Sequence, residues 1–373
     1  MNGASLTIGI EEEYQIIDPA TRELRSYVQR FLEQGRTVLA DQIHPEFLQS
    51  QVEAGTRICR NVAEAREEVT RMRRSIWALA EAEGLWVAAA GTHPFSSWAR
   101  QEVSPFGRYP ELARFLQDVG RRLLIFGTHV HIGIEDPQLL IEVMNAIREF
   151  LPHILALSSS SPFWHGRDTG LKSYRSVLFE SLPRTGIPPR FDTYGEYRAY
   201  VELLLATGSL AEPTHIWWDV RPSERFATLE VRIPDSCTRI AETICVAALV
   251  QAIVAKLVRL RQTGERWPVY RKHLLDENKW RAVRYGTEGK LIDFEQRREV
   301  DLPVLAEGLL TWVDDVLDEL GSRTEAEYVE TILREGSSAD RQRTVYRRTG
   351  DLRAVVDRVV EESREGMPTL RGD

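Results

Sequence analysis

The chain has 373 residues, of which 43% are hydrophobic and 28% charged, and its formal charge is −8. These fractions are those of an ordinary globular protein and exclude global disorder, while the length allows one large domain or two to three smaller ones. The acidic balance argues against nucleic acid as a partner, because polyanions bind to basic surfaces.

Strand-like and helix-like segments alternate along the chain, with no repeat and no linker that would mark a domain boundary. The clearest helix is predicted over residues 61–84, because Asn61 is a suitable N-cap, Glu64 follows three residues later and Gly84 suits the end. We therefore expect a single domain over residues 1–373. It should hold strands over 8–17, 50–56, 128–134 and 228–234, helices over 61–84, 138–158 (bent or ended near Pro152) and 240–260, and a charged helical layer over 302–363 with breaks at Gly321, Gly336 and Gly350.

Nothing in the sequence points to a membrane or to export. Residues 1–6 have no basic stretch followed by an apolar core, so no signal peptide is expected. The longest apolar segment, 244–258, is interrupted by Gln251 and Lys256 and is shorter than a membrane span, which predicts a buried helix. Three cysteines without a CxxC pair make no disulfide framework, so we expect a cytoplasmic protein.

The four predicted strands share an unusual pattern of side chains. Residues two apart in a strand point the same way, so each strand has one apolar face and one polar face. A sheet with one covered and one open face is typical of antiparallel strands. Glu12 is the exception, because it falls on the apolar side, and we expect it at a strand end or beside a cation. The polar faces carry Glu11, Glu13, Glu53, His129, His131, Glu230 and Arg232.

If these strands share one sheet, their polar faces form a dense cluster of carboxylates with two imidazoles. Such carboxylates repel and raise each other's pKa unless cations neutralise them. Divalent cations with oxygen ligands are the natural neutraliser, and magnesium usually brings phosphates with it. Taken singly, each signal has a plainer interpretation: strand glutamates are mostly solvated, Glu230 and Arg232 suit a surface pair, and the HxH spacing of the histidines is more often structural than zinc-binding.

Two other segments combine charged or aromatic side chains in loops. Residues 166–176 hold three basic side chains and four hydroxyls, a composition that suits carboxylate or phosphate binding but is common in basic loops. The WWDVRPS run, 217–223, fits an aromatic corner with a capping aspartate and a substrate site equally well.

Seven blocks of sequence occur in the order and spacing of one family. They are GIEEEY (9–14), PEFLQSQVEAGT (45–56), GTHPF (91–95), GTHVHIGI (127–134), SPFWHGRDTGLKSYR (161–175), WWDVRPS with TLEVRIPD (217–235) and NKWRAVRYG (278–286). Over these blocks the chain resembles the type 2 glutamate–cysteine ligase family, the YbdK-like carboxylate–amine ligases. The resemblance covers residues 8–293 and, more loosely, the helical C-terminus.

The resemblance implies an α+β fold like that of glutamine synthetase, a curved antiparallel sheet backed by helices, whose concave face binds ATP, metal and L-glutamate. It also implies the reaction. The γ-carboxylate of glutamate attacks the γ-phosphorus of ATP, and a small amine, cysteine by family default, displaces phosphate from the acyl phosphate. Two or three Mg²⁺ ions, or Mn²⁺, would neutralise the triphosphate. Members of the family often form homodimers.

Motif matching also implies roles for individual residues. The implied metal ligands are Glu11, Glu13, Glu46, Glu53 and Glu230, with His131 close to the metals and phosphates and His129 a weaker candidate. Arg232 would stabilise the transferring phosphoryl group. The candidates for the glutamate α-carboxylate are Arg167, Arg175 and Arg221, and those for the nucleotide phosphates are Arg281 and Arg284.

Two other functions remain as alternatives. A zinc or binuclear metallohydrolase would use the histidines and glutamates without ATP, although the chain has no HxxxH helix. A non-catalytic relative would keep the sheet as a binding module, although a decayed site should lose charges that cost folding stability. The segment 186–193, with two consecutive prolines, is expected near the substrate side, where it would shape the amine pocket. No residue identifies the acceptor amine.

Overall fold

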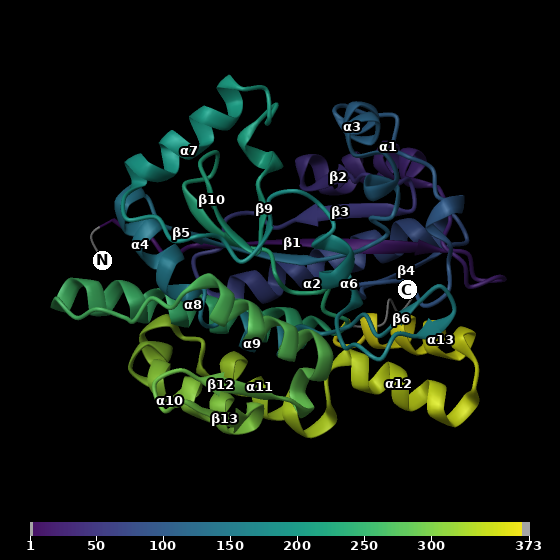
Figure 1. Cartoon of the computed structure of the whole chain (residues 1–373). Coiled ribbons are helices and arrows are strands. Elements are labelled where there is room, and N and C mark those ends of the chain that lie inside the picture. Colours follow the sequence, from purple (N-terminus) through teal and green to yellow (C-terminus); the bar gives the residue numbers. More distant parts are fainter. Residues whose placement is uncertain (1–2, 368–373) are drawn as a thin grey trace.

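The computed structural model describes residues 3–367 and is built around a seven-stranded antiparallel sheet (Figure 1). The four predicted strands are confirmed as consecutive neighbours in this sheet, in the order β11, β5, β1, β3. β10 and β2 extend the two ends, and β4 pairs with the last residues of β1. The strands are β1 (Ile8–Ile17), β2 (Ile43–Pro45), β3 (Gln51–Gly55), β4 (Trp86–Ala88), β5 (Thr128–Gly133), β10 (Val220–Ser223) and β11 (Thr228–Val231).

The strand register brings the polar residues side by side. Glu11 lies opposite His129, and Glu13 lies opposite Glu53. His131 lies opposite Glu230 on its other side. Since the pleat sends alternate residues to the same face, these side chains gather on one face of the sheet.

The apolar face of the sheet is covered by helices α2 (Val62–Ala82) and α8 (Ile240–Thr263), which contact β1 and β5. α8 is long and apolar enough to cross a membrane by length and composition, but 83% of its most apolar window is buried in this protein. It is therefore the core helix that its sequence predicts.

The predicted C-terminal helical layer is confirmed and lies beyond α8, on the side away from the polar face (Figure 1). Its helices end at the expected glycines, and Gly321 and Gly350 adopt the left-handed conformation that a helix end favours. The layer consists of α10 (Leu302–Leu320), α11 (Arg323–Glu335), α12 (Ser338–Thr349) and α13 (Leu352–Ser363).

Two further helix predictions are confirmed, one of them with the expected break. α2 begins as predicted, with the Asn61 side chain accepting the Glu64 backbone N–H. The helical segment over 138–158 is interrupted close to Pro152, as expected, and folds as α4 (Pro137–Ile147) and α5 (Leu151–Ser158). Pro152 fits the first turn of α5, where no helical N–H is required, so the chain restarts a helix there.

The buried exception Glu12 meets a cation, as expected. Its carboxylate lies 2.5 Å from the Arg73 guanidinium, and both side chains are fully buried. Tyr14 and Thr243 donate further hydrogen bonds to the same carboxylate. This ion pair joins β1 to α2 behind the sheet.

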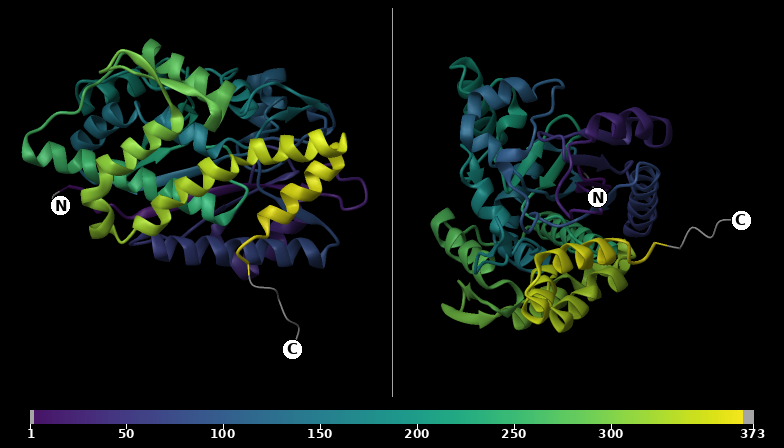
Figure 2. Two further views of the ribbon diagram at one scale, coloured as in Figure 1. Left: turned by 90° about the horizontal axis from the view of Figure 1, so that it is seen from below. Right: turned by 90° about the vertical axis from the view of Figure 1, so that its right-hand side faces the viewer.

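The remaining elements surround the polar face, pack at the edges of the sheet or, in α9, β12 and β13, lie on the side of the C-terminal layer. α3 (Tyr109–Arg121) and α7 (Tyr194–Ala206) rise on the side of the sheet opposite the C-terminal layer (Figures 1 and 2). The other elements are α1 (Val28–Leu39), α6 (Tyr174–Phe179), α9 (Lys272–Tyr285), β6 (Phe163–Trp164), β7 (Arg167–Asp168), β8 (Thr185–Gly186), β9 (Trp217–Trp218), β12 (Lys290–Asp293) and β13 (Arg298–Asp301), with four short 3₁₀ helices at 40–42, 98–100, 213–215 and 286–288.

Candidate active site

The polar face of the sheet is the floor of a cleft with two lobes. The small lobe has a volume of about 280 Å³ and the large lobe about 900 Å³. Their shared lining, which we call the junction, includes Glu11, Glu46, Glu53, Arg108, His131 and Arg225. The two lobes therefore meet over the carboxylates that the sequence predicted.

Acidic side chains form two clusters in this cleft. The first cluster is Glu11, His131 and Glu230, and the second is Glu13, Glu46 and Glu53. Within each cluster, one potential ligand atom from every residue lies within 4.8 Å of the others. All five predicted metal-binding glutamates and His131 are thus brought together, from β1, β3, β5, β11 and the residue after β2.

Among the described residues, none of the three carboxylates of the second cluster forms an ion pair with a lysine or arginine, although Arg232 lies near enough to favour their charged forms. Burial, followed by the charge of Glu46, raises the pKa of Glu13 to about 8. Burial, followed by the charges of Glu11, Glu46 and Glu13, raises the pKa of Glu53 well above its usual range. Repulsion on this scale is relieved when a cation binds between the carboxylates.

In the first cluster, Glu230 is held in its charged form by arginines, and histidines favour the charged form of Glu11. Burial opposes ionisation of Glu230, but the Arg232 and Arg221 guanidiniums outweigh it and keep the pKa of this carboxyl far below its usual range. Arg221 Nε donates to Glu230 Oε2 over 2.7 Å, and Arg232 bonds the other oxygen. Glu230 is 2% exposed, so its charge is set by these partners rather than by solvent.

The two histidines differ in their environment. His131 Nδ1 bonds the Thr228 hydroxyl over 2.9 Å, while its buried Nε2 has no hydrogen-bond partner and lies 3.5 Å from Glu11 Oε1. His129 Nδ1 bonds Glu11 Oε2 over 3.2 Å, and burial, with the charge of Arg232, lowers its pKa to about 4. His131 therefore has a free nitrogen facing the first cluster, and His129 supports Glu11.

The donor set fits divalent metal ions. Carboxylate oxygens are the ligands that Mg²⁺ and Mn²⁺ prefer, and an imidazole nitrogen is compatible with Mn²⁺. The unpartnered His131 Nε2 and the mutual repulsion within the second cluster are both satisfied by cations at these two places. Glu11, His131 and Glu230 would hold one ion, and Glu13, Glu46 and Glu53 another.

Two of the three arginines expected to bind the glutamate α-carboxylate lie at the small lobe, and both donate hydrogen bonds to the protein. Arg221 bonds Glu230 and gives both Nη1 protons to the carbonyls of Thr214 and Ile216. Arg175 donates to the carbonyls of Arg232 and Ile233. Arg221 thus has no free bidentate edge for a carboxylate and holds Glu230 in place, whereas Arg175 keeps a buried Nε without a hydrogen-bond partner.

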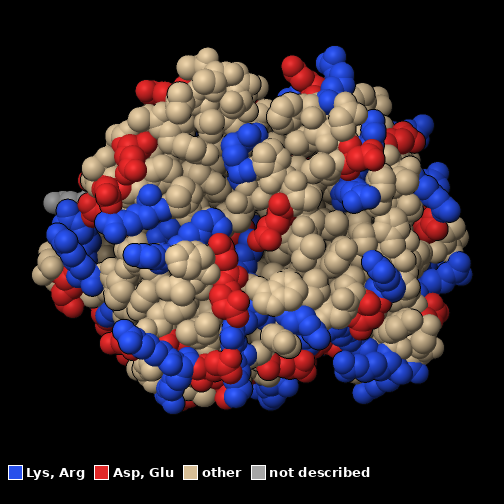
Figure 3. Space-filling view, viewed as in Figure 1, with Lys and Arg blue, Asp and Glu red and all other residues tan. Residues whose placement is uncertain are grey.

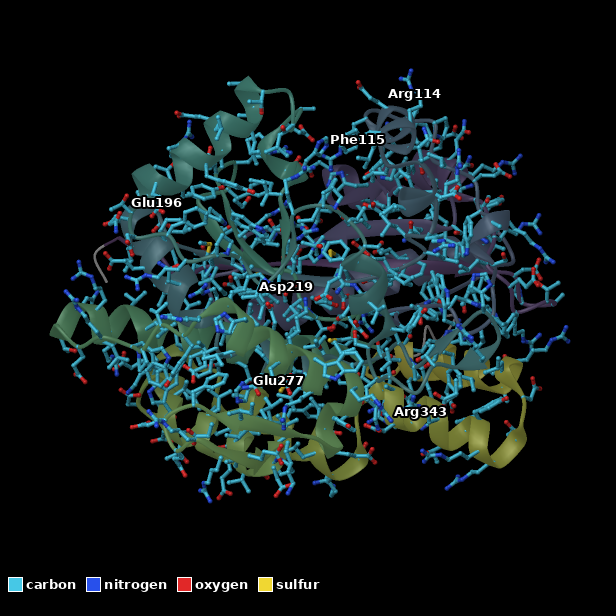
Figure 4. The ribbon with its side chains drawn as sticks, viewed as in Figure 1. Arg114, Phe115, Glu196, Asp219, Glu277 and Arg343 are labelled. Atoms are coloured by element: carbon cyan, nitrogen blue, oxygen red, sulfur yellow. The ribbon has the colours of Figure 1, made fainter. Side chains whose placement is uncertain are left out.

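The structure does not bring the other three predicted arginines to the cleft. Arg167 lies on the exposed hairpin strand β7. Arg281 is held at the surface of α9 by Glu277 and Glu299, at 2.9 and 2.7 Å, and Figure 4 shows Glu277 low on the molecule. Arg284 donates to the Gly170 carbonyl. The predicted roles of these three residues are corrected, because sequence proximity to matching motifs did not reveal which way each side chain points.

Some residues of the WWDVRPS run lie in the core and others line the cleft. Trp217 lines the small lobe, whereas Trp218 packs against Tyr200 in the core. Asp219 forms a buried ion pair with Lys279 of α9 over 2.7 Å, and its carbonyl accepts the Arg232 N–H. This aspartate therefore supports the strand that carries Arg232 instead of capping a helix.

The segment 186–193 lies away from the cleft, contrary to expectation. Its Arg190, Phe191 and Asp192 line a separate cavity of about 480 Å³ beside α4 and the end of α8. Arg148, which is buried, donates to the Pro188 carbonyl and fixes the segment there. It has no part in the lining of either lobe.

Sequence reasoning missed several residues of the junction. Arg108 and Tyr109 come from the start of α3, and Arg225 and Phe226 come from the turn between β10 and β11. Arg108 bonds Glu212 and, over 2.9 Å, Thr214, so it connects the two walls of the cleft. These residues lie where the sequence has no periodic pattern. The one signal that could have identified them is an arginine directly followed by an aromatic residue, which occurs in both pairs.

Comparison with known proteins identifies the family of this chain. The model of "Glutamate-cysteine ligase family 2" matches residues 7–358. A protein of Herpetosiphon aurantiacus, named "Putative glutamate--cysteine ligase 2", is 52% identical over 97% of this chain and 94% of its own length. A protein of the same name from Roseiflexus sp. is 53% identical over 98% of this chain and 96% of its own.

Solved structures show the same fold at much lower identity. The glutamate–cysteine ligase of Francisella tularensis, crystallised with AMP, has a TM-score of 0.69 and 14% identity, over 97% of this chain and 90% of that one. A bifunctional glutathione synthetase of Pasteurella multocida has a TM-score of 0.67 and 13% identity, over 96% of this chain and 53% of that one. The fold is therefore the predicted glutamine synthetase-like one. The chain belongs to glutamate–cysteine ligase family 2 and is a carboxylate–amine ligase of the glutamate–cysteine ligase type.

Proposed function

We propose that the protein joins the γ-carboxyl group of L-glutamate to a small amine, with ATP as the second substrate and Mg²⁺ as the resident metal. The observation that carries this proposal is the pair of acidic clusters at the junction, with Arg232 beside them. A site with this much negative charge can accept a triphosphate only when cations neutralise both partners.

The sizes of the two lobes assign the substrates. The small lobe, at about 280 Å³, lies below the roughly 300–1,000 Å³ of pockets for larger ligands, so it suits an amino acid. The large lobe, at about 900 Å³, has room for a nucleotide. The γ-phosphate would then reach the junction, where the glutamate γ-carboxylate enters from the other side.

The residues of the site would have two kinds of role, which are to stabilise charge and to hold other side chains in position. Bound Mg²⁺ would supply Lewis-acid neutralisation of the phosphate oxygens. Arg232, which lines the small lobe next to Glu230, would stabilise charge on the phosphoryl group as glutamate attacks it. Arg221 and Asp219 would hold Glu230 and Arg232 in place, so that little reorganisation accompanies the reaction.

The acceptor would occupy the rest of the small lobe, whose wall includes several apolar side chains. Leu112, Leu116, Phe179 and Trp217 line it. Such a wall excludes water from the acyl phosphate, and hydrolysis of that intermediate would otherwise compete with the amine. Cysteine is the first acceptor to test because of the family, and a supply of ATP fits the expected cytoplasmic location.

Phosphate release from MgATP tests the proposal. We expect release that requires both L-glutamate and one amine from a panel that includes cysteine. Glu230→Gln should lower this rate at least about 100-fold, because an amide cannot accept from both guanidiniums or serve as an anionic ligand. Arg281→Ala, outside the cleft, is the matched control and should retain the rate.

The same assay separates the alternatives. Hydrolysis of a substrate without ATP would support a metallohydrolase instead. Binding of MgATP without turnover under any pairing would support a non-catalytic relative. Equal rates in Glu230→Gln and the unmodified protein would remove the first cluster from the reaction.

A further inference from the structure

The arginines that line the cleft are almost all neutralised or fixed by the protein itself. Arg108 pairs with Glu212, and Arg221 and Arg232 share Glu230. Arg57 lies 3.8 Å from Glu68, and Arg175 is bonded to backbone carbonyls. Among residues 3–367, Arg225 is the arginine of the cleft with neither an ion pair nor a hydrogen bond to the protein.

The turn that carries Arg225 explains why the guanidinium has no partner in the protein. Its neighbour Glu224 is turned toward α7, where both carboxylate oxygens accept from Arg198 Nη1 at 3.1 and 3.0 Å. Phe226, on the other side, packs edge-on against the His131 ring with centroids 6.0 Å apart. The turn is therefore anchored on both sides, while the guanidinium of Arg225 rests 5.1 Å from the centre of the Phe226 ring.

Arg225 also lines both lobes, so it stands at the junction where the substrates would meet. The floor of the junction is acidic, and bound metal ions would neutralise it. The phosphate oxygens that face away from the floor need a cation from the opposite side, and a guanidinium matches phosphate bidentately.

We propose that Arg225 binds the β- and γ-phosphates of the nucleotide and is a substrate-binding residue of this enzyme. The inference rests on the proposed use of ATP. A substrate carboxylate offers the same anion chemistry, but Arg225 also lines the large lobe, which an amino acid substrate has no need to occupy. The phosphate is therefore the source that its position favours.

Nucleotide binding without turnover tests this inference. Titration calorimetry would compare MgATP and AMP on the unmodified protein, Arg225→Ala, Arg225→Lys and the control Arg114→Ala. Arg114 is an exposed arginine on α3 outside both lobes (Figure 4). For Arg225→Ala we expect MgATP affinity to fall about 10- to 100-fold, the loss typical of a charge-assisted contact, while AMP affinity changes less than about threefold.

Arg225→Lys should recover part of the MgATP affinity, and Arg114→Ala should match the unmodified protein. Unchanged MgATP affinity in Arg225→Ala would overturn the inference. If only the KM for glutamate rises, the arginine binds the amino acid and the phosphate assignment is wrong. Because the titration needs no ligase turnover, weakened MgATP binding in a protein that ligates nothing would refute the proposed function and leave Arg225 as a nucleotide contact.

Discussion

Glu11 and Glu12 are adjacent on β1 and face opposite environments. Glu11 lines both lobes of the cleft, whereas Glu12 is fully buried against Arg73 behind the sheet. The pleat alone separates them, because successive side chains point to opposite faces. One carboxylate therefore belongs to the site and the other to the core.

Substitution of these two residues should separate stability from activity. Glu12→Gln leaves Arg73 buried without a counter-charge, so the free energy of unfolding should fall by about 3–5 kcal/mol while the folded protein keeps its rate. Glu11→Gln removes a charge that raises the pKa of Glu53, and the amide can still bond His129 Nδ1, so stability should hold while the rate falls at least about 100-fold. Urea unfolding and phosphate release measure the two effects. Equal loss of rate at both positions, per folded molecule, would contradict the assignment of faces.

At the scale of elements, the site depends on close approach between β5 and its neighbours. Gly127 immediately precedes β5, and a Cβ placed there would lie 2.4 Å from Arg175 Nη2. That nitrogen donates to the carbonyl of Arg232. The absence of a side chain at Gly127 thus allows Arg175 to hold the end of the strand that carries Arg232.

Gly127→Ala should therefore disturb both packing and catalysis. We expect a loss of about 1–3 kcal/mol in unfolding free energy, as for overpacked cores, and a fall in kcat from the displaced Arg232. Gly308→Ala is the matched control, since nothing lies within 4 Å of its added Cβ on α10. It should add about 0.5–1 kcal/mol of stability and leave kcat unchanged. A normal kcat in Gly127→Ala would show that Arg175 does not position Arg232.

The sequence predicted elements with a short-range pattern much better than those without one. The four strands and their polar faces follow from a period of two, and α2 and the C-terminal helices follow from caps and glycines. The break between α4 and α5 also has such a signal, in Pro152, whereas the cleft walls α3 and α7 lie outside the predicted elements. The errors over Arg167, Arg281 and Arg284 have the same origin, because contacts far apart in sequence decide where a flexible side chain points.

At the scale of the whole molecule, charge is concentrated inside the cleft and balanced outside it. On the face shown in Figure 3, acidic and basic side chains are interspersed and no broad area carries one sign. The C-terminal layer is attached to the site by charge as well, since Lys172, in the loop before α6, pairs with Asp340 of α12. The layer therefore fixes the loop that leads to Arg175.

Buried histidines make stability depend on pH across the molecule. His93 is fully buried, its Nδ1 accepts the Ser96 backbone N–H over 2.9 Å, and its Nε2 bonds the Arg22 carbonyl. Burial lowers its pKa to about 3. The unfolded chain binds a proton below about pH 6.5 and the folded protein does not, so acid favours unfolding between these two values.

The slope that His93 contributes can be measured with His93→Asn, whose amide oxygen can still accept the Ser96 N–H. Between pH 5.5 and 4.5, where the unfolded histidine is almost fully protonated, the unmodified protein should lose about 1.3 kcal/mol of unfolding free energy per pH unit more than the variant. Glu149 changes stability in the opposite direction. Burial raises its pKa to about 7 in the folded protein, so the folded state gains stability as the pH falls from 7 to 4.5. Its effect is common to both proteins and cancels in the difference. Parallel pH profiles of the two proteins, from urea unfolding at each pH, would show that His93 titrates normally in the folded state.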